Sequence, residues 1–269
     1  MSSEKTHRFP LIDEYMARRM EVHLSAVDPG HVEVVESPRR LHREQSYGFI
    51  HALWWIRIED GRSAASVPPG AGDAVKELLP QHIRSGEELF DEQLAERLKT
   101  PVDAALRKAG LKRVDRVLTD MFFGCNAELL RKHGYGECRR LTDESVPPAQ
   151  GLSLPVHCFP DGNVHGVVVD GEVVSIAFAH HGGCMEDQVA DLGVSTAPPH
   201  RRCRYAKTAV SAVVLEITRN GGQARYACRP DNAASIATAR SVGFVPYGTS
   251  MILSAPARDT GEQEGPNRD

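Results

Sequence analysis

The chain has 269 residues, of which 41% are hydrophobic and 25% are charged, and its formal net charge is -4. These values are ordinary for a globular protein, and a mildly acidic chain excludes the broad basic surface typical of proteins that bind nucleic acid. No apolar run approaches the roughly 20 residues that cross a bilayer, and the N-terminal residues lack the apolar segment of a secretory signal. We therefore expect a cytoplasmic protein without nucleic-acid or membrane partners.

The first 141 residues alternate between helical and strand patterns. Helical spacing predicts helices over 14–27, 73–79, 87–98, 102–109 and 126–133. Aromatic and β-branched runs predict strands over 31–36, 46–58, 63–67, 113–121 and 135–141. Asp60-Gly61 is a hairpin turn signal between the second and third of these strands. No catalytic motif occurs here, so we expect residues 1–138 to form an accessory α/β region.

A Pro/Gly-rich turn, Pro68-Pro69-Gly70-Ala71-Gly72, lies between the strand over 63–67 and the helix over 73–79. Glycines before a helix can form a phosphate cradle, but this turn lacks the lysine and the spacing of a nucleotide-binding loop. We therefore predict an ordinary turn.

The sequence patterns after residue 141 indicate helices and strands more clearly than those before it. Strands are expected over 164–169, 172–179, 189–196, 224–229 and 247–253, and helices over 206–217 and 235–242. The turn Asp170-Gly171 makes the first two strands a hairpin. From residue 255 onward the polar tail is expected to be disordered. Together these elements predict an α/β fold built on a mixed sheet.

Six cysteines are scattered without a Cys-x-x-Cys pair, at positions 125, 138, 158, 184, 203 and 228. This arrangement favours reduced thiols over a disulfide framework or a zinc ribbon. A metal site on His180, His181 and Cys184 would lack a fourth ligand. We therefore expect no metal.

A basic turn links the strand over 189–196 to the helix over 206–217. Pro198 and Pro199 end the strand, and three arginines crowd the residues that follow, which are Arg201, Arg202, Cys203, Arg204, Tyr205 and Ala206. The first backbone N–H groups of a helix have no intrahelical partner, and the helix dipole adds partial positive charge there. This turn is therefore a candidate site for a small anion.

The same turn resembles the pyrophosphate loop Arg/Gln-x-x-Gly-x-Gly/Ala of the GNAT superfamily of acyl-CoA-dependent N-acyltransferases. Arg201 and Ala206 match that pattern, whereas Arg204 replaces its central glycine. Downstream, Asn232-Ala233-Ala234-Ser235 and Val242-Gly243-Phe244 resemble the family's Asn-x-x-Ser and Leu-Gly-Phe signatures, and the hairpin over 164–180 resembles its central hairpin. The resemblance covers about residues 139–253.

By this resemblance we expect a GNAT-like domain over residues 139–254, preceded by the accessory region 1–138 and followed by a disordered tail, 255–269. GNAT proteins with an N-terminal extension include resistance enzymes of the zwittermicin type, so the resemblance implies a small amine metabolite as substrate. A degenerate GNAT half is the alternative for the accessory region. A homodimer is compatible with the sequence.

The resemblance also implies how acetyl-CoA would bind. The turn from Arg201 to Ala206 would bind the pyrophosphate, and the backbone of Leu192 and Val194 would pair with the pantetheine arm. Asn232 would lie near the thioester, and Ser235 belongs to the same binding site. Asn232 could also cap the helix that follows it. Arg204 either points out of a closed loop or impairs binding, and charge compensation favours the first.

The catalytic groups are less sharply indicated. A carboxylate near the acceptor could take the amine proton, and the candidates are Asp191, between apolar neighbours, then Glu186 and Asp187, with His180 and His181 as rivals. The tyrosine that acts as the general acid in the family is replaced here by Ala239. Tyr247, Tyr226 or solvent would then protonate the leaving thiolate. Cys228 is expected to be a buried structural thiol.

We therefore predict an N-acetyltransferase that moves an acetyl group from acetyl-CoA to a primary amine of a small molecule, by direct attack in a ternary complex. Two alternatives stay open. The losses at Arg204 and Ala239 are compatible with a non-catalytic acyl-CoA-binding or regulatory protein. An open acceptor groove would instead favour a protein N-acetyltransferase.

Overall fold

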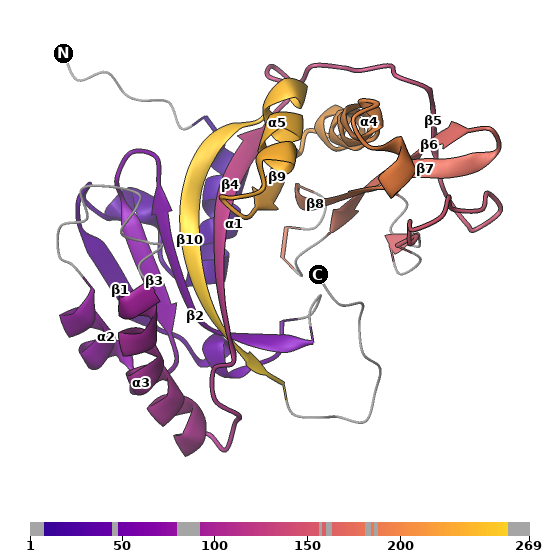
Figure 1. Cartoon of the computed structure of the whole chain (residues 1–269). Helices are drawn as coiled ribbons and strands as arrows, with labels where there is room; N and C mark the ends of the chain where they lie inside the picture. Colours follow the sequence, from indigo (N-terminus) through magenta and orange to yellow (C-terminus); the bar gives the residue numbers. More distant parts are fainter. Residues whose placement is uncertain are drawn as a thin grey trace, which may run out of the picture. The chain divides into compact units, whose positions relative to one another are not determined.

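A computed structural model describes residues 8–44, 48–79, 92–155, 158–159, 163–180, 184–185 and 188–257. The chain divides into two compact units (Figure 1). The N-terminal unit comprises Asp13–Met121 with Tyr247–Asp269, and the C-terminal unit comprises Met1–Ile12 with Phe122–Pro246. The functional division expected at residue 139 stays a prediction.

The N-terminal unit is built on a mixed sheet with the strand order β1-β3-β2-β10-β4. The strands are β1 (Val32–Glu36), β2 (Phe49–Ile58), β3 (Ser63–Val67), β4 (Arg116–Cys125) and β10 (Val245–Pro256), of which β4 and β10 also contribute residues to the other unit. β2 and β3 pair antiparallel, which confirms the predicted hairpin, and β1 pairs parallel to β3. Because β10 continues to Pro256, the disordered tail expected from residue 255 is wrong at its start, and residues 258–269 lie outside the described residues.

The helices of this region are α1 (Pro10–Met20), α2 (Gly72–Leu78) and α3 (Glu92–Lys108), with short 3-10 turns at Leu24–Ala26 and Pro38–Leu41. The predicted helix over 14–27 is too long, because Glu21 adopts a left-handed φ of 57° that ends α1. The helices predicted over 87–98 and 102–109 are helical up to Lys108 in their described residues, but they form one helix, α3, with Pro101 inside it, so the predicted break is wrong. Residues 87–91 lie outside the described residues.

A continuous apolar stripe explains why α3 passes through Pro101. Leu94, Leu98, Val102 and Ala105 are buried at helical spacing, and they pack into one core with Trp55 on β2. Proline in a helix interior costs roughly 3 kcal/mol, and burial of a few large apolar side chains offsets a cost of that size.

The Pro/Gly-rich turn before α2 is occupied by a side chain of the protein itself. The carboxylate oxygen Oε1 of Glu36 accepts hydrogen bonds from the backbone N–H groups of Gly70, at 3.0 Å, and Gly72, at 2.8 Å. An internal carboxylate thus satisfies the groups that a phosphate would need. This supports the prediction of a structural turn.

Replacing Glu36 with alanine is expected to lower the free energy of unfolding by about 1–2 kcal/mol, because two backbone donors lose a charged acceptor. Glu36→Gln keeps an acceptor oxygen at the same reach and should lose less than half as much. Urea denaturation of the three proteins measures both values. Equal losses in the two variants would show that the hydrogen bonds to Gly70 and Gly72 do not carry the effect.

The C-terminal unit contains the strand order β4-β9-β8-β7-β6-β5. The strands are β5 (Glu137–Arg140), β6 (Val164–Val169), β7 (Glu172–His180), β8 (Val189–Thr196) and β9 (Gln223–Cys228), joined to the part of β4 from Phe122 onward. β5 to β8 pair antiparallel, whereas β8 and β9 pair parallel. The predicted β6–β7 hairpin and the mixed α/β fold are confirmed.

Two helices of this unit position the candidate site: α4 (Tyr205–Arg219), which packs on β6, β7 and β8, and α5 (Ala233–Val242), which packs on β9 and α4. A 3-10 turn at Pro198–His200 separates β8 from the basic turn. α4 buries the predicted apolar face, which includes Val210, Val213 and Ile217. Across the part of the chain that the structure describes, no helix is long and apolar enough to cross a membrane.

The helix predicted over 126–133 is wrong. The segment that follows β4 instead runs without regular structure from the end of α5 to the start of α4, and we call residues 129–136 the strap. The N–H group of Arg131 donates to the carbonyl of Val242 at 2.8 Å, and the N–H group of His133 donates to Ser211 Oγ on α4 at 3.2 Å. Hydrogen bonds to two helices thus replace those within a helix.

Candidate functional site

Strand β8 has a partner on both edges for only part of its length. Its parallel pairing with β9 ends at Leu192↔Tyr226, whereas its pairing with β7 continues to Thr196↔Ser175. From Gly193 onward, the edge of β8 that faces β9 is therefore not part of a strand pair in the described structure. An extended ligand can pair with a strand edge of this kind.

The basic turn lies just beyond this fork. Arg202 and Arg204 adopt left-handed backbone conformations, with φ of 66° and 67°. Arg204 is the N-cap residue of α4, and its side chain makes no capping hydrogen bond. The N–H group of Lys207 donates to the carbonyl of Arg204 at 3.1 Å, so the N–H groups of Tyr205 and Ala206, together with the partial positive charge of the helix N-terminus, are the ones suited to binding an anion.

The conformation of Arg204 explains what the missing glycine means. Left-handed geometry costs a residue with a Cβ roughly 1–2 kcal/mol, whereas glycine adopts it freely. Arg204 nevertheless occupies it, and its side chain leaves the turn to lie on Tyr135 of the strap. The Nη1 atom of Arg204 donates to the Tyr135 hydroxyl at 3.0 Å, and the guanidinium carbon lies 5.2 Å from the ring centroid.

The other predicted residues of the turn lie beside Arg204. Arg201 Nε reaches the carbonyl of Thr196 at 3.4 Å, and the exposed Cys203 thiol reaches the carbonyl of Arg201 at 3.6 Å. Tyr205 and Ala206, both half-buried, begin α4. The structure thus gathers all six predicted residues of this turn in one place.

The two residues expected beside the pantetheine arm lie on β8 at the fork. Leu192 is buried at the last pair with β9, and Val194 is half-buried beyond it and pairs with Ala177 of β7. Asn232 caps α5, because its Oδ1 accepts from the N–H group of Ser235 at 3.0 Å. The predicted cap is confirmed, and the contacts of these residues with the donor stay predictions.

Tyr226 stands at the end of the β8–β9 pairing with its side chain against α5. Its hydroxyl lies 2.7 Å from Ser235 Oγ, and its ring lies 5.4 Å from that of Phe244. Burial raises the pKa of Tyr226 to about 12. A thiol has a pKa of about 8.5, so proton transfer from Tyr226 to a thiolate is uphill, and this phenol is suited to donating a hydrogen bond.

Asp191, the first candidate for the base, is paired with Arg225 on the neighbouring strand. Arg225 Nη2 donates to Asp191 Oδ2 at 2.6 Å, Arg225 Nε donates to Oδ1, and the guanidinium lies 4.7 Å from the ring centroid of Phe122. Successive side chains of a strand point to opposite faces, so this pair lies on the other face of the sheet from Tyr226. To accept a proton, the Asp191 carboxylate must lose one of its two hydrogen bonds from Arg225.

His180, the rival base, is the partner of Asp191 on β7. Its Nδ1 atom lies 3.8 Å from the thiol of Cys158, which is buried. His180, Asp191 and Arg225 therefore form one row across three strands, one residue before the fork.

The remaining catalytic candidates lie outside the described residues or belong to the N-terminal unit. Glu186, Asp187 and His181 lie outside the described residues. Tyr247 belongs to the N-terminal unit, where its hydroxyl donates to Asp13 Oδ1 at 2.8 Å. Its role as general acid stays a prediction. Cys228 is buried.

The sequence analysis did not identify two residues that contact the candidate site, Arg225 and Tyr135. The sequence gives a weak signal for Arg225 as a partner of Asp191. Each is a charged residue inside a predicted strand, and the two charges are opposite. The pairing becomes visible only with the strand register. Tyr135 carries no signal, since a half-exposed tyrosine in an irregular segment is ordinary.

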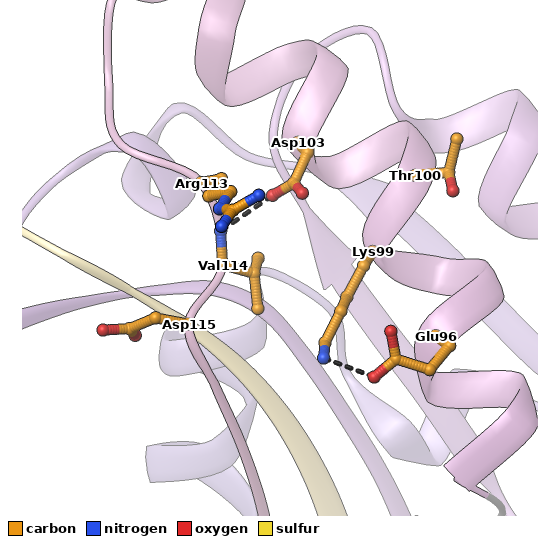
Figure 2. Close-up of a pocket in the computed structure, with 7 residues that line it drawn as sticks. All are labelled: Glu96, Lys99, Thr100, Asp103, Arg113, Val114 and Asp115. Carbon is orange, nitrogen blue, oxygen red and sulfur yellow. Dashed lines mark hydrogen bonds and ion pairs between the residues drawn. The ribbon is translucent and has the colours of Figure 1, made fainter.

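A separate hollow of about 510 Å³ lies in the N-terminal unit, and none of the predicted site residues lines it (Figure 2). It is lined by Glu96, Lys99, Thr100, Asp103, Arg113, Val114 and Asp115. Lys99 pairs with Glu96, and Asp103 accepts a hydrogen bond from the N–H group of Val114 at 2.7 Å. These charges are thus engaged with one another or with the backbone (Figure 2).

Within the ranges that the structure describes, no group of three or more His, Cys, Asp or Glu side chains could hold a metal ion. The absence of a metal stays a prediction for the whole chain.

Residues 132–244 match the family model described as the acetyltransferase (GNAT) family. This range includes the fork, the basic turn, α4 and α5. No curated protein matched the chain.

Several solved structures are similar at low identity. A GNAT-family protein of Novosphingobium aromaticivorans is 19% identical over 54% of this chain and 68% of its own, with a TM-score of 0.45. A GNAT acetyltransferase of Colwellia psychrerythraea is 13% identical over 56% of this chain and 62% of its own, with a TM-score of 0.42. A tandem GNAT protein from the clavulanic acid biosynthesis pathway is 17% identical over 61% of this chain and 59% of its own, with a TM-score of 0.41.

Proposed function

We propose, from the match of residues 132–244 to the model of the acetyltransferase (GNAT) family, that the chain moves an acetyl group from acetyl-CoA to a primary amine of a small molecule. We assign this reaction to residues 139–254 and an accessory role to residues 1–138. The amine attacks the thioester directly, while donor and acceptor are bound together.

The observation that carries the proposal is the fork between β8 and β9 with the open N-terminus of α4 beyond it. The pantetheine arm pairs with β8 from Leu192 to Val194, in the place that β9 leaves. The pyrophosphate meets the N–H groups of the turn from Arg201 to Ala206, where three arginines add charge. Asn232 and Ser235 lie on the α5 side of the thioester end.

The chemistry follows from this placement. The neutral amine attacks the thioester carbonyl carbon, the C–S bond breaks as the tetrahedral intermediate collapses, and the electron pair leaves with the CoA thiolate. We assign removal of the amine proton to Asp191, which gives up part of its pair with Arg225. Tyr226 keeps its own proton, because burial raises its pKa to about 12, so solvent protonates the thiolate. Holding the two reactants together supplies much of the rate.

Acetyl-CoA titration by calorimetry tests the donor site. We expect micromolar binding by the wild type and about threefold to tenfold weaker binding by Arg201→Ala, because one charge at the pyrophosphate is lost. Arg219→Ala, at the exposed opposite end of α4, is the matched control and should bind as the wild type does. Wild-type protein that binds no acetyl-CoA would refute the proposal.

An acceptor panel separates the two enzymatic alternatives. Small primary amines are compared with peptides that carry a free N-terminus or a lysine, and release of CoA is followed for each. Turnover with small amines supports the proposal. Turnover with peptides alone would make the chain a protein N-acetyltransferase.

A further inference from the structure

The strap lies along the first turns of α4. The N–H group of His133 donates to Ser211 Oγ at 3.2 Å, and that of Tyr135 donates to Thr208 Oγ1 at 2.8 Å. Gly136 lies against the ring of Tyr205, since a Cβ added there would be 3.3 Å from the ring. The strap therefore follows one side of the helix down to the residue next to Arg204.

The other end of the strap is attached to α5. Arg131 donates its N–H group to the carbonyl of Val242 at 2.8 Å, and His133 Nε2 lies 3.0 Å from the carbonyl of Ser241. These carbonyls belong to the last turn of α5, which lacks intrahelical donors. The rings of His133 and Tyr135 stack, with centroids 6.0 Å apart. Tyr135 is thus held from both sides although its side chain is 37% exposed.

Arg204 is the residue that this tyrosine meets. Its guanidinium donates to the hydroxyl of Tyr135 and lies over its ring. Arg202, the other left-handed arginine of the turn, makes no side-chain hydrogen bond or ion pair in the described structure and is exposed. Arg202 and Arg204 thus have the same backbone strain, but only the Arg204 side chain is held by a contact, the one with Tyr135.

We propose that Tyr135 is a positioning residue of the donor site, which fixes Arg204 in the left-handed conformation that glycine would adopt without help. The contact draws the long side chain onto the strap and away from the first N–H groups of α4, so those donors stay open to the pyrophosphate. The chain thereby retains the geometry of the turn without the glycine. This inference rests on the proposed function for the identity of the ligand, but the contact between Tyr135 and Arg204 can be tested without any ligand.

A double-mutant cycle on acetyl-CoA affinity is the test, with the dissociation constant measured by calorimetry. Tyr135→Ala should weaken binding about threefold to tenfold, because the hydroxyl and the ring face are both lost. Tyr135→Phe keeps the ring and should lose about twofold to threefold. In the Arg204→Gly background, Tyr135→Ala should change affinity less than twofold, since glycine needs no anchor.

The Arg202→Gly background is the matched control. It relieves the same backbone strain at a residue that does not contact Tyr135, so Tyr135→Ala should there cost the full threefold to tenfold. Equal losses in the Arg204→Gly and Arg202→Gly backgrounds, or no loss from Tyr135→Ala in the wild type, would overturn the proposal.

Thermal unfolding separates this inference from the proposed function. Arg204→Gly should raise the melting temperature by about 2–4 °C more in the Tyr135→Ala background than in the wild type, because only strain is then removed. If the wild type binds no acetyl-CoA, the proposed function fails, and this difference alone decides whether Tyr135 holds Arg204. No difference would overturn the inference.

Discussion

Replacing Gly243 with alanine is expected to lower the free energy of unfolding of the C-terminal unit by more than about 3 kcal/mol. Gly243 ends α5 with a φ of 108°, which a residue with a Cβ rarely adopts. An added Cβ would also overlap the carbonyl oxygen of Leu129 and lie 2.8 Å from its carbonyl carbon. Both obstacles are backbone, so the strap or the end of α5 must move.

Gly221→Ala is the control for this prediction. Gly221 follows the end of α4 with a φ of 78°, but an added Cβ would meet nothing within 4 Å. Its cost should therefore be the conformational part alone, about 1 kcal/mol. Urea denaturation of both variants gives the comparison. Similar losses in the two would mean that the strap does not press on Gly243.

Asp191→Asn is expected to lower kcat about a hundredfold or more while the acetyl-CoA dissociation constant changes less than about twofold. A general base contributes roughly 10²–10⁴ to the rate, and the asparagine side chain keeps one acceptor for Arg225. The best amine from the acceptor panel serves as the substrate.

Arg225→Gln distinguishes catalysis from structure at this pair. It removes the guanidinium but keeps the carboxylate, so kcat should fall much less than in Asp191→Asn. Both variants break a pair of side chains that are 7% and 19% exposed, and each should lose about 2–4 kcal/mol of stability. The rates are therefore compared at a temperature where both proteins are folded. Equal loss of kcat would make Asp191 a structural partner of Arg225 and would remove it from the reaction.

Local patterns predicted most of the C-terminal unit. The alternation of residues 164–180 around Asp170-Gly171 predicted the β6–β7 hairpin, and the apolar spacing from Ala206 to Ile217 predicted α4. Both succeed because side-chain periodicity and turn chemistry are properties of neighbouring residues. The candidate donor turn was found for the same reason, since a strand, a basic turn and a helix follow one another directly.

The failures lie where distant segments compete with local preference. Residues 126–133 have helical spacing, but the N–H groups of Arg131 and His133 bond to α5 and α4 instead of continuing the turn at Asn126. Residues 87–98 and 102–109 were predicted as two helices, but the apolar stripe of α3 is buried on both sides of Pro101. In each case tertiary burial or hydrogen bonding outweighs a local propensity of a few kcal/mol at most.

The sequence by itself therefore determined the elements, their order and the basic turn, because each of these depends on residues within about one helix or hairpin of one another. Only the tertiary structure decided that the pairing of β8 with β9 ends at Leu192. It also decided that Arg225 pairs with Asp191 and that Arg204 hydrogen-bonds to Tyr135. These pairings join residues 34 and 69 positions apart in the chain. Strand register and the path of the strap bring them together, and neither is encoded in a local pattern.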